Sequence, residues 1–509
     1  MNRKLAKWFV IFSEKHLAKR CFFIYSSGII FHLDFMKKTK IIATHGPALK
    51  GEADLQALYD AGVNVIRFNF SHAQYESVRE VLTLMRKNNR SGRTALSMLL
   101  DTKGPEIRTG DLSQKQQYAK GDIFKLYVNL EKFSEDGSSL FCDYPFLAQD
   151  GFEGQIIEID SGLFQVQVQK IENDFLEVVA LNDALIGNRR HVNLPGIRLK
   201  MPGITDKDKA DVKFAVEESM DFIAMSFVRS RANVEELRVY LKDLGAEHIK
   251  IISKIENQEG IENLAEIIEA SDGIMVARGD LGIEVPIEKL PTYQSDIVKQ
   301  TRAQGKFVII ATHLLESMIE NPFPTRAEVS DIYNSVMQRA DSVMLSGETA
   351  AGKYPIQSVE VMSATIREAE AHIDIVHQDF QAFDLTTRDI EKKSLIKSAI
   401  YAAEELKVEA LFIFTKSGKL ARLAAAFRPN LPIYAFTPNL SSVAYMNILY
   451  GVKPYLVENW DTDFVGNVAE AIDICKQEGI LQAGDRIMLV NDLRKKGKEV
   501  PLVELVEII

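Results

Sequence analysis

Cysteine is scarce in this sequence, with only three residues among 509. Cys21, Cys142 and Cys475 lie far apart and form no Cys-x-x-Cys pair. That spacing argues against a disulfide framework and against a cysteine-based zinc site. It favours a reducing compartment instead, so we expect a cytoplasmic protein.

An excess of positive charge is lacking as well. The formal net charge is −10 at pH 7, whereas proteins that bind nucleic acids normally carry a basic field. We therefore expect no nucleic-acid partner. A Gly-x₄-Gly-Lys-[Ser/Thr] sequence is also absent, which excludes a P-loop kinase as far as motifs can show.

The first 35 residues differ from the rest of the chain and contain two short apolar patches, residues 8–12 and 21–31. The second patch is broken by Ser26, Ser27 and Gly28 and is too short to span a bilayer. No small-x-small cleavage site follows it. We expect residues 1–35 to be a disordered extension or the product of a misassigned start codon, with a membrane anchor as the alternative.

From residue 38 onward, apolar strand-like runs alternate with helical segments. The runs are residues 39–44, 64–71, 95–102, 221–227, 250–256, 273–278, 307–312 and 342–346. Such alternation predicts an α/β fold with a parallel sheet, and eight strands favour a (β/α)₈ TIM barrel. We expect this barrel to comprise residues 36–108 and 202–373. An open doubly wound sheet is the alternative, although it usually has fewer strands.

Two further domains are predicted. Between the third and fourth strands the helical periodicity disappears, and residues 109–201 show short runs with period-two alternation. They predict a small β-barrel domain over the C-terminal mouth of the barrel, where it could act as a lid. Residues 374–509 predict a separate α/β domain that begins with a helix at residues 394–406 and ends with a strand at residues 502–508.

Polar residues gather at the carboxyl ends of the predicted barrel strands. Arg67, Asn69 and Ser71 alternate along one strand and share a face, and Lys254 and Glu256 do so on another. Other strand ends contribute Asp101, Thr102, Ser226, Asp280 and Thr312. Singly, each has an ordinary structural explanation, such as a helix cap at Ser226 or a buried ion pair. Their convergence favours a functional site, because buried charges are costly unless paired or bound to ligands.

The chemistry of these residues indicates their ligands. Glu256 and Asp280 are hard oxygen donors without neighbouring His or Cys, which suits Mg²⁺ or Mn²⁺. Arg67 and Lys254 supply positive charge for an anionic substrate. The oxygens of Asn69, Ser71, Asp101 and Thr102 form a set typical of a monovalent-cation site. Together they predict phosphoryl transfer or enolate stabilisation.

These motifs resemble, in this order, those of the pyruvate kinase family along nearly the whole chain from Met36. The matching segments are residues 39–47 (TKIIATHGP), 64–72 (NVIRFNFSH), 100–110 (LDTKGPEIRTG), 192–196 (VNLPG), 251–257 (IISKIEN), 272–282 (DGIMVARGDLG), 324–331 (PTRAEVSD) and 343–350 (VMLSGETA). The resemblance implies an enzyme that transfers a phosphoryl group from phosphoenolpyruvate to ADP, giving pyruvate and ATP. It also implies a homotetramer that requires Mg²⁺ (or Mn²⁺) and K⁺.

The resemblance assigns roles to the residues. Those implied for catalysis are Lys254, Thr312 and Arg67. Those implied for the substrate are Arg67, Ser226, Lys254, Gly279, Asp280 and Thr312. Those implied for the nucleotide are Asn69, Phe70, Ser71, His72, Arg108 and Arg190. Those implied for Mg²⁺ are Glu256 and Asp280, and those for K⁺ are Asn69, Ser71, Asp101 and Thr102. Glu106 matches the K⁺-dependent form of the family.

Several positions depart from the family pattern. Arg190 and His191 stand where the family usually has Lys and Gly, which puts the nucleotide contact in question because Arg and Lys differ at phosphates. Ser161 replaces one of two carboxylates. In the last domain, Thr415, Lys416, Ser417, Gly418 and Lys419 resemble the family's effector loop, which implies a sugar phosphate or AMP. Leu420 replaces a hydroxyl there, so an unregulated loop is an equal alternative.

Two other functions remain open at this stage. One is a different metal-dependent enzyme that handles enolates or phosphoenolpyruvate on a barrel without needing ADP. The other is a non-catalytic metabolite sensor, although Lys254, Glu256, Asp280 and Thr312 are all present.

Overall fold

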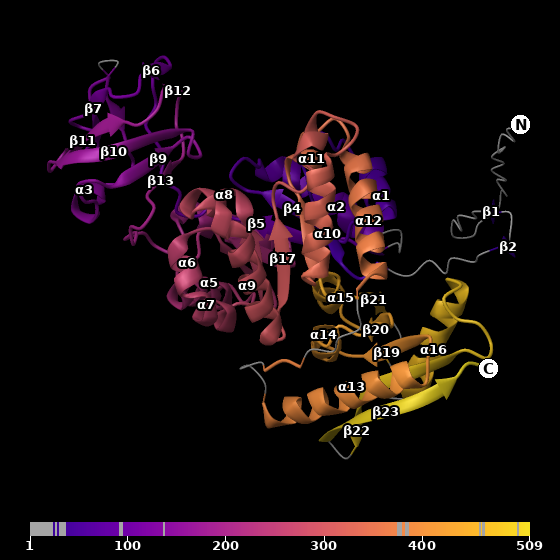
Figure 1. Ribbon diagram of the computed structural model, residues 1–509. Coiled ribbons are helices and arrows are strands. Elements are labelled where there is room, and N and C mark those ends of the chain that lie inside the picture. Colours follow the sequence, from indigo (N-terminus) through magenta and orange to yellow (C-terminus); the bar gives the residue numbers. More distant parts are fainter. Residues whose placement is uncertain are drawn as a thin grey trace, which may run out of the picture.

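The computed structural model describes residues 24–25, 28–29, 37–90, 95–135, 138–373, 379–381, 386–457, 460, 464–495 and 498–509. These form three units, with a central barrel between an inserted β domain and a C-terminal α/β domain (Figure 1). Most of the predicted N-terminal extension lies outside the described residues. Within it, β1 (Ile24–Tyr25) and β2 (Gly28–Ile29) form a short antiparallel pair.

The central unit is a closed barrel of eight parallel strands, which confirms the predicted fold class. Its strands are β3 (Lys40–Thr44), β4 (Val65–Asn69), β5 (Ser97–Asp101), β14 (Phe222–Met225), β15 (Lys250–Ile255), β16 (Gly273–Ala277), β17 (Phe307–Ala311) and β18 (Ser342–Leu345). Strand β5 pairs directly with β14. The inserted domain therefore does not interrupt the strand order of the barrel. It projects from the connection between β5 and β14.

Helices follow the barrel strands and surround them. They are α1 (Glu52–Ala61), α2 (Tyr75–Arg90), α4 (Asp206–Glu217), α5 (Arg231–Asp243), α6 (Gln258–Glu262), α7 (Leu264–Ala270), α8 (Arg278–Glu284), α9 (Leu290–Ala303), α10 (Arg326–Met337), α11 (Gly347–Ala350) and α12 (Pro355–Ala371). Short 3₁₀ turns lie at Ile287–Lys289 and Glu316–Ile319. No helix in the described part of the chain is long and apolar enough to cross a membrane.

Strand side chains alternate between two cores. Ile41 and Ile66 belong to the core under the helices, whereas Ile42 and Val65 belong to the core of the barrel interior. This alternation is the period-two pattern of a strand that is buried on both faces.

One glycine is required by the packing of the interior. A Cβ added to Gly273 would lie 2.2 Å from the ring of Phe307 on the neighbouring strand. A larger residue at position 273 would displace a ring that fills the barrel.

The inserted domain, predicted as a small β barrel, consists of a six-stranded and a two-stranded sheet. The six-stranded sheet has the order β13-β9-β10-β11-β7-β8. The elements are β6 (Gln116–Tyr118), β7 (Ile123–Tyr127), β8 (Leu140–Phe141), α3 (Leu147–Asp150), β9 (Ile156–Ile159), β10 (Phe164–Ile171), β11 (Phe175–Ala180), β12 (Ala184–Ile186) and β13 (Val192–Asn193). Period-two alternation along β10 and β11 buries one face of this sheet.

The C-terminal domain contains a five-stranded sheet of order β21-β20-β19-β22-β23. Its elements are α13 (Thr387–Glu405), β19 (Ala410–Phe414), α14 (Lys419–Ala426), β20 (Ile433–Thr437), α15 (Leu440–Met446), β21 (Val452–Leu456), α16 (Phe464–Gln477), β22 (Arg486–Lys495) and β23 (Lys498–Glu507). Helix α13 starts earlier than predicted because Thr386 and Asp389 form a capping box. The exact limits of the three domains remain predictions.

The C-terminal domain lies at the end of the barrel opposite the inserted domain (Figure 1). It contacts the starts of the barrel strands, where Lys40 Nζ donates to the carbonyl of Val452 at 2.6 Å. A charged contact there joins Arg428 to Asp341 through two hydrogen bonds of 2.8 and 2.6 Å. Both side chains are almost fully buried.

We expect Arg428→Met to lower the free energy of unfolding by about 3–5 kcal/mol, because it leaves the buried carboxylate of Asp341 without its cation. Urea denaturation measures this loss. Lys353→Met breaks an exposed pair with Glu320 and serves as the control, which should be nearly neutral. Equal stabilities of the two variants would contradict the importance of the buried pair.

Candidate active site

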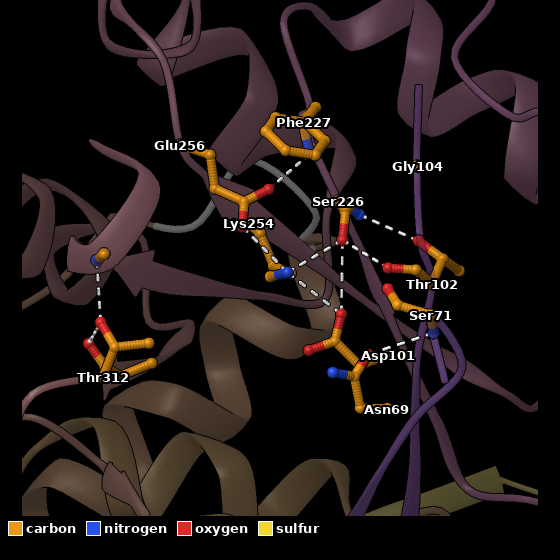
Figure 2. Close-up of polar contacts among 12 residues, drawn as sticks. Asn69, Ser71, Asp101, Thr102, Gly104, Ser226, Phe227, Lys254, Glu256 and Thr312 are labelled. Atoms are coloured by element: carbon orange, nitrogen blue, oxygen red, sulfur yellow. Dashed lines mark hydrogen bonds and ion pairs between the residues drawn. The ribbon is translucent and has the colours of Figure 1, made fainter. Parts of the chain in front are cut away.

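The predicted site residues converge at the carboxyl ends of the barrel strands, on the side of the inserted domain. Figure 2 shows Asp101 at the end of β5, Ser226 after β14, and Lys254 on β15 directed toward one another. Because β5, β14 and β15 are consecutive neighbours in the barrel, residues far apart in sequence meet here. Barrel enzymes carry their chemistry at this face.

Lys254 is the centre of this cluster. Its Nζ lies 3.1 Å from Asp101 Oδ1, 2.8 Å from Ser226 Oγ and 2.9 Å from Glu256 Oε1. The side chain of Lys254 is 11% exposed, and those of Asp101 and Glu256 are 1% exposed. A buried ammonium shared by two carboxylates and a hydroxyl has a fixed position, as transition-state stabilisation requires.

Ser226 bridges two strand ends. It does not cap a helix, which was the ordinary explanation that the sequence offered for this residue. Its hydroxyl lies 2.6 Å from the carbonyl of Thr102, and its amide donates to Thr102 Oγ1 at 3.1 Å. The next helix, α5, begins after Ser230. Ser226 and Thr102 therefore hold the ends of β5 and β14 in register beside Lys254.

Arg67 on β4 extends the positive charge of the site. Its Nε lies 2.6 Å from Asp101 Oδ2, and its Nη1 donates to Thr44 Oγ1 at 3.0 Å. Burial raises the pKa of Asp101, but the charges of Arg67 and Lys254 outweigh it and hold that pKa below its ordinary value. Asp101 is therefore ionised and anchors both cations.

Glu256 has the properties of a metal ligand. Its Oε2 accepts the amide of Phe227 at 2.6 Å, whereas its buried Oε1 has no well-aligned hydrogen bond despite the nearby Lys254. Burial raises the pKa of Glu256 to about 7, because Lys254 offsets only part of the loss of hydration and Asp280 adds repulsion. A divalent cation between the carboxylates of Glu256 and Asp280 would relieve both problems.

Among the residues that the structure describes, no three or more His, Cys, Asp or Glu side chains form a metal-binding group. Mg²⁺ commonly uses one or two protein carboxylates and completes its shell with water and substrate oxygens. The carboxylates of Glu256 and Asp280 fit an ion of that kind, with Lys254 beside Oε1 of Glu256.

Thr312 lies across the mouth from Lys254 (Figure 2). Its Oγ1 accepts the amide of Gly279 at 2.8 Å, at the start of α8. Both Thr312 and His313 have positive φ, of 69° and 55°, a conformation that is rare for a β-branched residue.

Arg278 supports this unusual turn. It donates to the carbonyls of Ala311 and Thr312 and forms two hydrogen bonds, of 2.8 and 2.7 Å, with Asp331 on α10. Arg278 thus ties α8, the Thr312 turn and α10 together. Sequence reasoning assigned no role to Arg278 or Asp331, although both lie within the motifs quoted above.

The residues predicted for a monovalent cation lie beside Asp101. Figure 2 shows Asn69, Ser71 and Thr102 around it. Asn69 Oδ1 accepts the amide of Ser71 at 3.2 Å, and the amide of Phe70 donates to the carbonyl of Asp101 at 3.0 Å. The amide of His72 donates to the carbonyl of Asn69, which closes the turn.

Two predicted nucleotide residues, Arg108 and Arg190, lie in the segments that join the barrel to the inserted domain. Arg108 pairs with Glu106 at 2.6 Å. Arg190 lies 3.3 Å from Asp160, and its buried Nε has no hydrogen-bond partner. Both arginines are thus held by carboxylates, and Arg190 keeps donor capacity for a ligand.

The predicted effector residues lie in the C-terminal domain, at the far end of the barrel. Gly418 adopts a φ of 76° before α14. Lys419 pairs with Asp389 at 2.7 Å, and the carbonyl of Lys416 accepts three side-chain hydrogen bonds. Leu420 is buried. The structure does not bring these residues near the cluster around Lys254.

Comparison with known proteins identifies the family. Residues 36–359 match the model "Pyruvate kinase, barrel domain", and residues 393–499 match "Pyruvate kinase, alpha/beta domain". The chain is 39% identical to the pyruvate kinase of Geobacillus stearothermophilus over 89% of this chain and 77% of that protein. It is 37% identical to that of Clostridium acetobutylicum over 89% and 96%.

A solved structure agrees. The crystal structure of a pyruvate kinase from Cryptosporidium parvum superposes with a TM-score of 0.85 at 34% identity, covering 93% of this chain and 96% of the other. The similarity extends over barrel, inserted domain and C-terminal domain. The chain belongs to the pyruvate kinase family.

Proposed function

We propose that this chain transfers a phosphoryl group between phosphoenolpyruvate and ADP, giving pyruvate and ATP. The observation that carries the proposal is the buried position of Lys254 between Asp101, Ser226 and Glu256 at the barrel mouth, in a member of this family. Phosphoryl transfer depends mainly on positioning and charge neutralisation. A fixed cation beside carboxylates that can hold a metal supplies both.

Glu256 and Asp280 would hold Mg²⁺ or Mn²⁺. When bound, the ion would neutralise negative charge on the substrate oxygens. The amide of Phe227 orients the carboxylate of Glu256, and Asp280, at the start of α8, is near enough for its charge to repel that carboxylate.

Lys254 and Arg67 would bind the phosphoryl group of the substrate. The Nζ of Lys254 would lie where charge develops on the transferring group and on the enolate oxygen. Asp101 keeps both cations in place through contacts of 2.6 and 3.1 Å. Ser226 would lie near the phosphate.

The substrate carboxylate would bind the backbone amides of Gly279 and Asp280, since a helix N-terminus favours an anion. It would have to take the Gly279 amide from Thr312 Oγ1, which accepts it in the structure. Thr312 accepts the Gly279 amide, so its hydroxyl lies next to this position. In this arrangement Thr312 would belong to the path that brings a proton to the enolate carbon. The strained turn held by Arg278 gives the hydroxyl a defined direction.

The monovalent cation and the nucleotide would bind on the β4 side of the mouth. Asn69, Ser71, Asp101 and Thr102 would bind K⁺. The residues proposed for the nucleotide are Asn69, Phe70, Ser71, His72, Arg108 and Arg190.

Pyruvate formation from phosphoenolpyruvate and ADP, coupled to lactate dehydrogenase, tests the function directly. We expect activity that requires a divalent cation and falls at least about tenfold when K⁺ is replaced by tetramethylammonium, because a cation beside the phosphates would be lost. Glu106→Lys should reduce this K⁺ dependence, since the lysine would supply within the chain the positive charge that K⁺ otherwise provides. Glu320→Lys, an exposed substitution, is the control. Undiminished activity without K⁺ would contradict the monovalent site.

The same assay separates the alternatives. Product formed without ADP would favour another enolate-handling enzyme, and absence of turnover with retained ligand binding would favour a sensor. A homotetramer, a sugar-phosphate or AMP effector at residues 415–419, and a cytoplasmic location remain parts of the proposal. An effector phosphate would have to compete with Asp389 for Lys419.

A further inference from the structure

A histidine of the inserted domain, His191, contacts Phe227 beside the catalytic cluster. The ring of His191 lies edge-on against the ring of Phe227, with centroids 6.0 Å apart and an interplanar angle of 62°. The carbonyl of His191 accepts the amide of Asp160 at 2.9 Å, and its backbone bridges to Arg108. His191 therefore moves with the inserted domain, whereas Phe227 belongs to the barrel.

Phe227 is itself held in an unusual conformation. Its φ is 54°, which is rare for an aromatic residue. Its ring lies over Gly104, where an added Cβ would approach Phe227 Cδ2 to 3.0 Å and Ser226 Cβ to 2.7 Å. Phe227 is thus confined by Gly104 and contacted by His191. This conformation directs its amide to Glu256 Oε2 at 2.6 Å.

The contact between the two rings borders open space. A cavity of about 240 Å³ between the inserted domain and the barrel is lined in part by Glu106, His191, Asn193, Phe227 and Glu284. The ring pair therefore lies at the wall of this cavity and is not embedded in continuous packing.

The contact is aromatic in character. Burial lowers the pKa of His191, although the surrounding carboxylates of Glu106, Asp280 and Asp143 act in the opposite direction and Arg108 supports the lowering. The imidazole is then neutral near pH 7 and presents a ring, which phenylalanine can imitate.

We propose that His191 is a positioning residue, which holds Phe227 so that the Phe227 amide aligns Glu256 for the divalent cation. The inference rests on the proposed role of Glu256 as a metal ligand. It means that the inserted domain affects metal binding through a contact and not by shielding the site alone. Loss of an edge-on aromatic contact corresponds to about a two- to tenfold change in an equilibrium constant.

Mn²⁺ binding to the full chain, followed by electron paramagnetic resonance without substrates, tests the proposal. His191→Ala should weaken Mn²⁺ binding about two- to tenfold. His191→Phe should restore it to within about twofold of the unchanged chain, because the ring contact returns. His248→Ala, at an exposed turn of the barrel, should leave binding unchanged. Circular dichroism and thermal melting check that each variant is folded.

Kinetics add a second measurement. The Mn²⁺ concentration for half-maximal activity should rise in His191→Ala, with kcat recovered at saturating Mn²⁺ and the KM for ADP unchanged. Unaltered Mn²⁺ affinity in folded His191→Ala would overturn the proposal. So would His191→Phe binding as weakly as His191→Ala, or a change confined to the KM for ADP.

The two proposals can fail separately. If His191→Ala weakens Mn²⁺ binding but the unchanged chain forms no ATP, this inference is supported and the proposed function is contradicted. If Glu256→Gln leaves Mn²⁺ binding intact, the ion lies elsewhere and the inference is overturned.

Discussion

Replacing Lys254 by alanine is expected to lower turnover by about a hundredfold to a thousandfold. This is the range seen when one group that stabilises developing charge is removed. Lys254 contacts Asp101, Ser226 and Glu256 simultaneously. Among the residues that the structure describes, no other cation is positioned to replace Lys254. The nearby Arg67 is already engaged with Asp101 and Thr44. The coupled assay at saturating substrate and Mg²⁺ measures the effect on kcat.

The fold should survive this change. Alanine leaves two buried carboxylates without their shared cation, which costs stability, but Glu256 can take up a proton and relieve part of the cost. Circular dichroism and thermal melting check the fold, and Lys353→Ala, at an exposed lysine, controls for loss of a positive charge. Near-normal turnover by folded Lys254→Ala would refute the role of Lys254.

Glu256→Gln should abolish tight binding of the divalent ion, with a loss of at least about a hundredfold in affinity. Even residues that only hydrogen-bond to a metal ligand contribute about ten- to a hundredfold to metal affinity, and a ligand itself should contribute more. Glutamine keeps the shape of the side chain and an oxygen that can accept the Phe227 amide. It removes the charge that the ion requires. Titration with Mn²⁺ measures the affinity, and kcat/KM at fixed metal should fall in parallel.

Stability should respond differently from activity in this variant. The carboxylate of Glu256 is fully buried, and its Oε1 has no well-aligned hydrogen bond, so a neutral amide avoids part of the desolvation cost. We expect the melting temperature of Glu256→Gln without metal to be equal to or above that of the unchanged chain. Glu320→Gln, at an exposed carboxylate, is the matched control. Unchanged Mn²⁺ affinity in Glu256→Gln would show that the ion is not held there.

Local periodicity explains why the fold class could be predicted. Each barrel strand is a short apolar run, and the crossover helices between the runs imply parallel pairing. Some element ends were missed for local reasons. The Thr386–Asp389 capping box moves the start of α13 ahead of residue 394, and β23 starts at Lys498 because β22 and β23 form a long antiparallel hairpin. The short helix α3 in the inserted domain has no strong periodic signal.

The sequence by itself determined the eight-stranded α/β barrel and the polar character of its mouth, because alternation along a strand places Arg67 with Asn69, and Lys254 with Glu256, on shared faces. Only the tertiary structure decided the partners of Lys254, since barrel closure brings β5, β14 and β15 side by side. It also decided the contacts of Phe227, His191 and Arg278. These depend on a backbone dihedral, a contact between domains and a link between two helices, none of which follows from the period of a strand.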